Sequence, residues 1–138
     1  MVSLRYLLDT NTVIEALRRR DDTLRRRFVE NDTQMAVSTV TVAELAYGSE
    51  RSSDPARNRR AVDGLIGRLV VLDLDMPAAE HSGQIRAQLA AKGTPIGPYD
   101  LLIAGQARAH GLIVVTNNVR EFSRVDGLRV EDWTTAPR

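Results

Sequence analysis

Cysteine is absent from this 138-residue sequence, and its absence excludes disulfide scaffolds, thiolate metal sites, thiol nucleophiles and dithiol redox motifs. Any bound metal must therefore use oxygen or histidine nitrogen as a ligand. Long hydrophobic runs are absent too, because stretches such as residues 69–72 and 112–115 are far too short to span a membrane. The first residues form no signal-peptide pattern before Asp9, so we expect a cytoplasmic protein.

Lysine is almost absent, since Lys92 is the only one. The net charge is nevertheless only +1, because 19 basic residues stand against 18 acidic ones. Two explanations remain open for the arginine bias: a genome rich in G and C replaces lysine codons, or guanidinium groups bind the phosphates and bases of RNA. The arginine runs at residues 18–20 and 25–27 do not decide between them, because such runs usually form solvated helix faces.

Familiar nucleotide-binding and hydrolase signatures are missing as well. The sequence has no P-loop, no G-x-G-x-x-G and no G-x-S-x-G elbow. The two histidines, His81 and His110, are far apart and are more typical of packing or surface positions than of a zinc site or general base. Phosphoaspartate chemistry at Asp9 is disfavoured, because Asn11 stands where a second acid is usual and Lys92 precedes a loop.

The length and composition, with 43% hydrophobic and 27% charged residues, fit one globular domain over residues 1–138. Short apolar runs alternate with helical patterns, and several runs are continuously apolar, which is typical of parallel strands covered on both faces. We therefore expect an α/β fold, a three-layer α/β/α arrangement around a mainly parallel sheet of four to five strands. The expected strands are residues 4–8, 35–38, 70–74, 112–115 and 128–130.

Helix boundaries are predicted from capping residues, proline and glycine. Thr12 with Glu15, and Thr41 with Glu44, have the spacing of capping boxes. The other predicted helix boundaries come from proline at the first position of a helix and from glycine just after its last residue. The expected helices begin at Thr12, cover residues 24–30 and 41–51, begin at Pro55, extend from Pro77 to Gly93, and cover residues 99–110 before Gly111.

Three carboxylates stand where a strand gives way to a helix. Asp9 follows the first strand, Glu44 lies near the start of the third helix, and Asp100 lies in the first turn of the helix after Pro98. Each has a purely structural explanation as a helix-capping or dipole-stabilising residue. That explanation does not cover the three acids together, because the carboxyl ends of parallel strands meet at one edge of a sheet and would bring the acids to one place.

Three carboxylates at one place repel one another and raise one another's pKa unless a cation lies between them. No lysine or arginine is adjacent to any of the three in sequence. A hard divalent ion meets that need, and all-oxygen ligation suits Mg²⁺ or Mn²⁺. The sequence therefore favours a metal site formed by Asp9, Glu44 and Asp100.

A fourth junction follows the strand at residues 112–115 and is rich in side-chain oxygen without being acidic. Thr116, Asn117 and Asn118 form either a simple Asx-type turn or, together with Asn11, a supporting shell for a metal-bound water. Glu121 and Asp126 lie just beyond, close enough in sequence to reach the site.

Four sequence blocks resemble those of PIN-domain nucleases. They are residues 7–11 (LLDTN), 41–48 (TVAELAYG), 100–104 (DLLIA) and 115–118 (VTNN), and they occur in the same order over the whole chain. More narrowly, the chain is similar to VapC toxins of VapBC toxin–antitoxin pairs. Residues 82–87, 97–100 and 120–133 resemble the VapC subgroup that cuts initiator tRNA in its anticodon region.

This resemblance implies a PIN-like fold and an endoribonuclease dependent on Mg²⁺ or Mn²⁺, with Asp9, Glu44 and Asp100 holding the metal. Many PIN domains have a fourth acid where this chain has Asn118. An activated water would attack the phosphodiester in line, leaving a 5′-phosphate and a 3′-hydroxyl. Arg86 and Arg120 are candidates for holding RNA phosphates.

The resemblance also implies partners, namely a VapB-type antitoxin that covers the acidic site, and a second copy of the chain in a homodimer. Two alternatives stay open at this stage. One is an RNA-binding or scaffold module whose acids only cap helices. The other is a PIN nuclease that cuts other RNA or DNA, because metal-assisted hydrolysis does not itself distinguish the two nucleic acids.

Overall fold

The computed structural model describes residues 3–134, which form a five-stranded sheet in the order β3-β2-β1-β4-β5. Every pair of neighbouring strands is parallel, which confirms the expected fold class. The strands are β1 (Tyr6–Leu8), β2 (Met35–Ser38), β3 (Val70–Leu72), β4 (Ile113–Val115) and β5 (Val130–Glu131).

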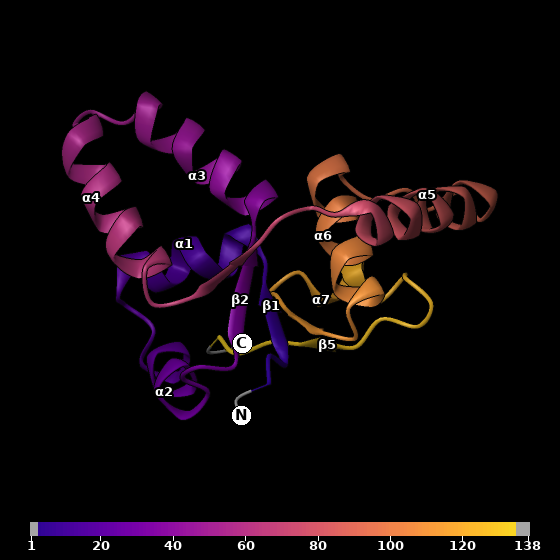
Figure 1. Ribbon diagram of the computed structural model, residues 1–138, viewed down its shortest axis with the longest axis horizontal. Coiled ribbons are helices and arrows are strands. Elements are labelled where there is room, and N and C mark those ends of the chain that lie inside the picture. Colours follow the sequence, from indigo (N-terminus) through magenta and orange to yellow (C-terminus); the bar gives the residue numbers. More distant parts are fainter. Residues whose placement is uncertain (1–2, 135–138) are drawn as a thin grey trace.

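Helices cover both faces of this sheet, and the alternation of side chains along each strand decides which core each residue joins. The helices are α1 (Thr10–Arg18), α2 (Asp22–Glu30), α3 (Thr39–Arg51), α4 (Pro55–Ile66), α5 (Met76–Ala91), α6 (Pro98–Ala109) and α7 (Val119–Phe122), and Figure 1 shows their arrangement around the sheet. Leu8, Val37 and Val115 pack with residues of α1, α2 and α4, while Leu7 and Val114 pack with residues of α5, α6 and α7 on the other face.

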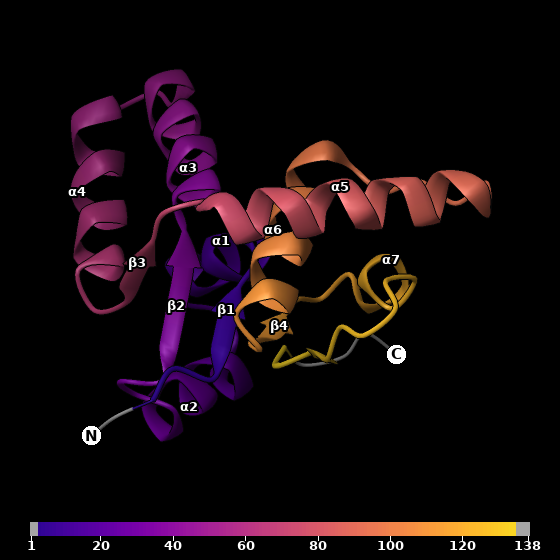
Figure 2. The same cartoon turned by 45° about the vertical axis from the view of Figure 1, so that its right-hand side comes forward.

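Figure 2 shows α3 and α4 projecting together from one end of the sheet, while α5 extends in another direction across the molecule. The start of α3 stays close to the sheet and contacts α6. Within residues 3–134, no helix is both long and apolar enough to cross a membrane.

Two predicted helix starts are wrong, because residues just upstream of the capping boxes make better caps. Asp9 caps α1 by accepting the N–H of Thr12 at 2.8 Å, and Ser38 caps α3 by accepting the N–H of Val40 at 3.0 Å. The helix α3 therefore begins before Thr41, and Glu44 lies in its second turn. Helix capping thus does not account for Glu44.

The remaining boundaries differ from expectation mainly at the edges of the sheet. Strand β3 is shorter than predicted and its valines are exposed, because it is an edge strand, and β5 lies slightly later than residues 128–130. Helix α7 was not predicted, since four residues give no periodic pattern. Gly93 and Gly111 have positive φ values of 68° and 66°, as expected of glycines that end helices.

Candidate active site

Asp9 lies at the carboxyl edge of β1 with only 1% of its surface exposed. Besides the N–H of Thr12, it accepts a hydrogen bond from the hydroxyl of Thr116, which lies 2.5 Å from Oδ2. Thr116 follows β4, the parallel neighbour of β1, so sheet topology alone brings the two residues together. Both oxygens of the Asp9 carboxylate are therefore held in a fixed orientation.

Burial raises the pKa of Asp9 above its ordinary value, and the nearby Glu44 adds to the increase. The hydrogen bonds from Thr116 and Thr12 act in the opposite direction, because they stabilise the charged form. Burial therefore disfavours the charged form of Asp9, and the hydrogen-bond donors Thr116 and Thr12 partly offset this effect.

Glu44 is held by a threonine pair that joins α1 to α3. The Thr10 hydroxyl donates to Glu44 Oε1 at 2.6 Å and lies 3.1 Å from the Thr41 hydroxyl. Since the single hydroxyl proton of Thr10 is used on Glu44, Thr41 is the donor to Thr10. This chain of hydrogen bonds places Glu44 beside the end of β1.

Asp100 occupies the first turn of α6, as predicted, and is partly buried. The prediction that it stands where a strand gives way to a helix is wrong, because α6 follows helix α5. Burial, followed by repulsion from Glu121 and Asp9, raises its pKa to about 7, with contributions from a hydrogen bond to Glu121 and from the charge of Glu44. Three acids from three other parts of the chain therefore act on Asp100. Asp9, Glu44 and Glu121 thus lie close enough to Asp100 to act on its charge, while metal binding by Asp9, Glu44 and Asp100 stays a prediction.

Glu121 is the fourth acid at this site. Its Oε1 accepts the N–H of Gly97 at 2.9 Å, and its Oε2 accepts a hydrogen bond from the side-chain amide of Asn118. The sequence suggested only that Glu121 could reach the site, and nothing in it indicated the contact with Gly97. Asp126, the other residue considered, does not approach these acids, because it contacts Gln88 and Lys92 on α5 and just beyond it.

Asn118 has a clear place in this network although it is not acidic. Its backbone N–H donates to the Thr116 hydroxyl at 2.9 Å, while its side chain holds Glu121. Asn118 and Thr116 therefore form a link between Glu121 and Asp9. Asn11 and Asn117, by contrast, are exposed, and their side chains form no hydrogen bond with any other residue between 3 and 134.

The four acids, Asp9, Glu44, Asp100 and Glu121, have no cationic partner, since every ion pair in the described part of the chain involves other carboxylates. Among residues 3–134, no group of three or more acidic or histidine side chains is placed to hold a metal ion directly. Mg²⁺ does not require one, because it usually keeps several waters and binds directly to only one or two carboxylates. The donor set is entirely oxygen, which fits such an ion.

Comparison of the sequence with known protein families and proteins identifies the family. The PIN domain model matches residues 6–128, which is most of the sequence. The chain belongs to the PIN-domain family. Within it, 54% of residues are identical to the tRNA(fMet)-specific endonuclease VapC of Salmonella typhimurium, over 94% of this PIN domain and 98% of that protein. Ribonuclease VapC2 of Haemophilus influenzae is 47% identical over the same shares of the two chains.

Solved structures agree with this assignment. The chain of a DNA-bound VapBC from Salmonella typhimurium superposes with a TM-score of 0.91 at 54% identity, covering 94% of this PIN domain and 98% of that chain. VapBC2 from Rickettsia felis, bound to a DNA fragment from its promoter, gives a TM-score of 0.89 at 32% identity, with 94% and 99% covered. The expected resemblance to VapC proteins is confirmed.

The two arginines proposed for RNA binding are both exposed on this PIN domain. Arg120 lies on α7 directly before Glu121, and Arg86 lies on α5. Neither takes part in an ion pair within the described residues. Their charges are therefore free to meet an anion, and Arg120 is the one adjacent in sequence to the acidic site.

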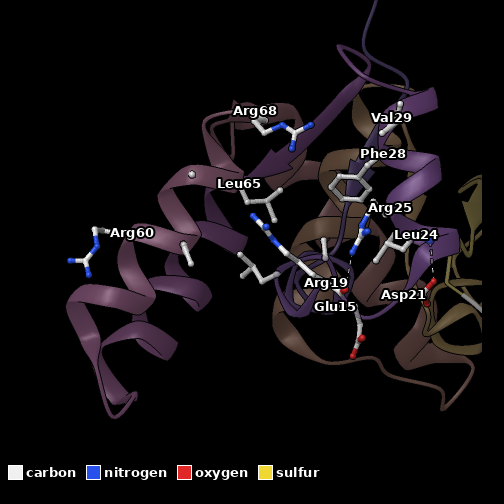
Figure 3. Close-up of a pocket in the computed structure, with 14 residues that line it drawn as sticks. Glu15, Arg19, Asp21, Leu24, Arg25, Phe28, Val29, Arg60, Leu65 and Arg68 are labelled. Carbon is white, nitrogen blue, oxygen red and sulfur yellow. Dashed lines mark hydrogen bonds between the residues drawn. The ribbon is translucent and has the colours of Figure 1, made fainter.

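A separate groove of about 680 Å³ lies between α1, α2 and α4 of this PIN domain (Figure 3). Its floor is apolar, with Leu24, Phe28 and Leu65 among the lining side chains. None of the four acids lines it, so the groove is a second surface distinct from the acidic site. Four arginines line it as well, namely Arg19, Arg25, Arg60 and Arg68.

Proposed function

We propose that the chain is the toxin of a VapBC pair and acts as a divalent-metal-dependent endoribonuclease. The observation that carries this proposal is the group of four carboxylates, Asp9, Glu44, Asp100 and Glu121, which has no cationic partner within residues 3–134. Burial and the neighbouring acids raise the pKa of Asp100 to about 7. Such an arrangement is costly to folding unless a cation compensates for it. The names of the relatives, endonuclease and ribonuclease, support the same activity.

Asp9, Glu44 and Asp100 are the residues proposed to hold Mg²⁺ or Mn²⁺, directly or through the waters that the ion keeps. Such an ion, when bound, lowers the pKa of a coordinated water and offsets the charge that develops on the phosphate during hydrolysis. Thr116 fixes the direction of the Asp9 carboxylate and Thr10 fixes that of Glu44, so that the ligand oxygens need little rearrangement. Glu121 supplies the negative charge that many PIN domains place at position 118.

The proposed substrate is tRNA, and initiator tRNA cut in its anticodon region is favoured. The support is 54% identity, over nearly the whole of both chains, with an enzyme named for specificity toward tRNA(fMet). The choice of substrate rests on this relationship. Cutting initiator tRNA would stop translation, which is the effect expected of a toxin.

Product ends test the chemistry of this proposal. Because an external water is the nucleophile, cleavage should leave a 5′-phosphate and a 3′-hydroxyl, which end-labelling of the products detects. A 2′,3′-cyclic phosphate would instead show attack by the RNA's own 2′-hydroxyl and would contradict the mechanism. Parallel digestion of single-stranded DNA distinguishes the RNase from a general nuclease, and binding without cleavage of any RNA or DNA would favour a scaffold module.

The proposed partner is a VapB-type antitoxin, together with a second copy of the chain in a homodimer. Two structural neighbours, with TM-scores of 0.91 and 0.89, are VapBC complexes. The groove between α1, α2 and α4 fits an amphipathic helix with acidic flanks, because its floor is apolar and arginines line it. A basic antitoxin side chain placed among the four acids would silence the enzyme by taking the position of the metal.

A further inference from the structure

Two tyrosines beside the acidic site are exposed although aromatic side chains are scarce in this protein. Tyr47 has 63% of its surface exposed and Tyr99 has 57%. Tyr99 directly precedes Asp100 at the start of α6, and Tyr47 lies three residues after Glu44 on α3. Each ring thus lies within one helical turn of a proposed metal ligand.

The stripe of α3 that carries Tyr47 faces α6. Val40, seven residues earlier and therefore on the same stripe of the helix, packs against the core that contains Ile103 of α6. Helix α3 also contacts α6 directly. Figure 1 shows the starts of the two helices at the same end of the sheet. Tyr47 and Tyr99 therefore belong to two helices that each carry one of the acids.

Tyr47 is also paired with a cation one turn further along the helix. Arg51 Nη1 donates to the Tyr47 hydroxyl at 3.2 Å, and the guanidinium carbon lies 5.5 Å from the ring centroid. This contact restricts the exposed ring and adds a positive charge at the outer end of α3. An aromatic face beside a guanidinium suits one nucleotide, because the base stacks on the ring while the cation meets a phosphate.

An acidic site has a particular need for such contacts. Carboxylates repel the phosphates of RNA, so substrate affinity near them must come from groups other than the acids themselves. Stacking on an aromatic ring does not depend on charge, and it is available only to bases that are not already paired inside a helix. Exposed rings near the acids would therefore bind looped or single-stranded RNA and leave duplex RNA unbound.

We propose that Tyr47 and Tyr99 stack on unpaired bases near the scissile phosphate and so restrict the site to RNA loops. This inference rests on the proposed ribonuclease function and adds the positioning of the substrate to it. The two rings are contact residues for the substrate and take no part in the hydrolysis itself.

RNA binding by an Asp100→Asn chain, which cannot cleave, tests the proposal directly. The probes are a fluorescein-labelled RNA stem–loop and a fully paired RNA duplex of equal length, measured by fluorescence anisotropy. Adding Tyr47→Ala or Tyr99→Ala should each weaken stem–loop binding about tenfold, while Tyr→Phe at either position should not. Val29→Ala, which changes an exposed side chain on α2, serves as the matched control.

A second readout reports stacking itself. The fluorescence of 2-aminopurine placed in the loop should be quenched when the chain binds and recover in the alanine variants, with thermal unfolding unchanged. Stem–loop binding that is identical in both alanine variants and the Asp100→Asn parent overturns the stacking proposal and leaves the ribonuclease proposal standing. Absence of binding to every RNA by the folded parent overturns both.

Discussion

At the scale of single residues, the acidic site depends on a balance between repulsion and hydrogen bonding. Asp9 is almost wholly buried, yet it keeps two strong donors, Thr12 and Thr116. Asp100 has no such compensation, so burial and the neighbouring acids raise its pKa to about 7. The stability of the metal-free protein and its affinity for a cation are therefore coupled through these side chains.

Stability should fall as pH rises in the absence of metal. The Asp100 carboxyl ionises near 3.8 when unfolded and near 7 when folded, so the folded state loses stability as pH increases through that interval. Thermal unfolding in chelator between about pH 5 and about pH 8 should show a larger fall in Tm for the natural chain than for Asp100→Asn. Parallel pH curves for the two proteins would contradict this explanation of Asp100.

The Thr116 hydroxyl should matter through Asp9. Thr116→Val removes the donor to Asp9 Oδ2, which leaves the carboxylate less well oriented and raises its pKa further. We expect magnesium to bind about 10- to 100-fold more weakly, as is typical when a partner of a ligating group is lost. Titration of cleavage rate against Mg²⁺ measures this, and Thr116→Ser, which keeps the hydroxyl, should remain near the natural value.

At the scale of helices and strands, the position of the site could be predicted and its last member could not. The order of apolar runs predicted a parallel sheet, which places Asp9 directly after β1 and the start of α3 directly after β2. Asp100 follows α5 and not a strand, so its place beside the other acids depends on how α6 packs. Glu121 escaped prediction as a definite member, because α7 is too short for periodicity and its contact is with Gly97, twenty-four residues earlier. Contacts of that kind arise only when loops fold back on one another.

The helix boundaries also show where prediction from the sequence fails. The capping boxes at Thr12 and Thr41 satisfied the sequence rule, but the side chains of Asp9 and Ser38 were already in place one turn earlier. Local rules rank candidate caps poorly when several polar residues stand together. For Glu44 the wrong helix start matters to function. The residue lies beyond the first turn of α3 and therefore does not cap it, and its hydrogen-bond partner is the hydroxyl of Thr10.

The crossing of α5 and α6 sets the position of Asp100 and depends on Gly105. A Cβ at this position would lie 2.0 Å from Ser82 Oγ and 2.9 Å from the carbonyl oxygen of Ala78. Because backbone is involved, Gly105→Ala should destabilise the protein by about 1–3 kcal/mol. Urea unfolding measures this.

Gly83→Ala is the matched control for that substitution. Gly83 lies inside α5, and a Cβ added there meets nothing within 4 Å. It should stabilise the helix by about 0.5–1 kcal/mol. Equal effects of the two substitutions would show that the helix crossing is not as close as described.

At the scale of the whole molecule, two surfaces lie apart from each other. The acidic site lies at the carboxyl edge of the sheet, while the groove with four arginines lies between α1, α2 and α4. This separation would let an antitoxin hold the toxin firmly through the groove while one further segment reaches the acids. Binding and inhibition could then be altered independently.

Charge reversal in the groove should weaken antitoxin binding without changing catalysis. Arg60→Glu combined with Arg68→Glu changes two lining side chains that form no ion pair within residues 3–134. We expect binding of the cognate VapB-type antitoxin to weaken about tenfold or more, measured by calorimetry, with unchanged RNA cleavage. Arg59→Glu, on the same helix but outside the groove, should have little effect.

The most direct test of the central claim is incubation of the purified, antitoxin-free chain with total bacterial tRNA, with Mg²⁺, Mn²⁺ or chelator, alongside Asp100→Asn. The products are then mapped by sequencing of their ends. We expect metal-dependent cuts in the anticodon region of initiator tRNA that are absent with chelator and in the variant. A folded, metal-loaded chain that leaves every tRNA intact, or one that cuts equally well in chelator, would contradict the account.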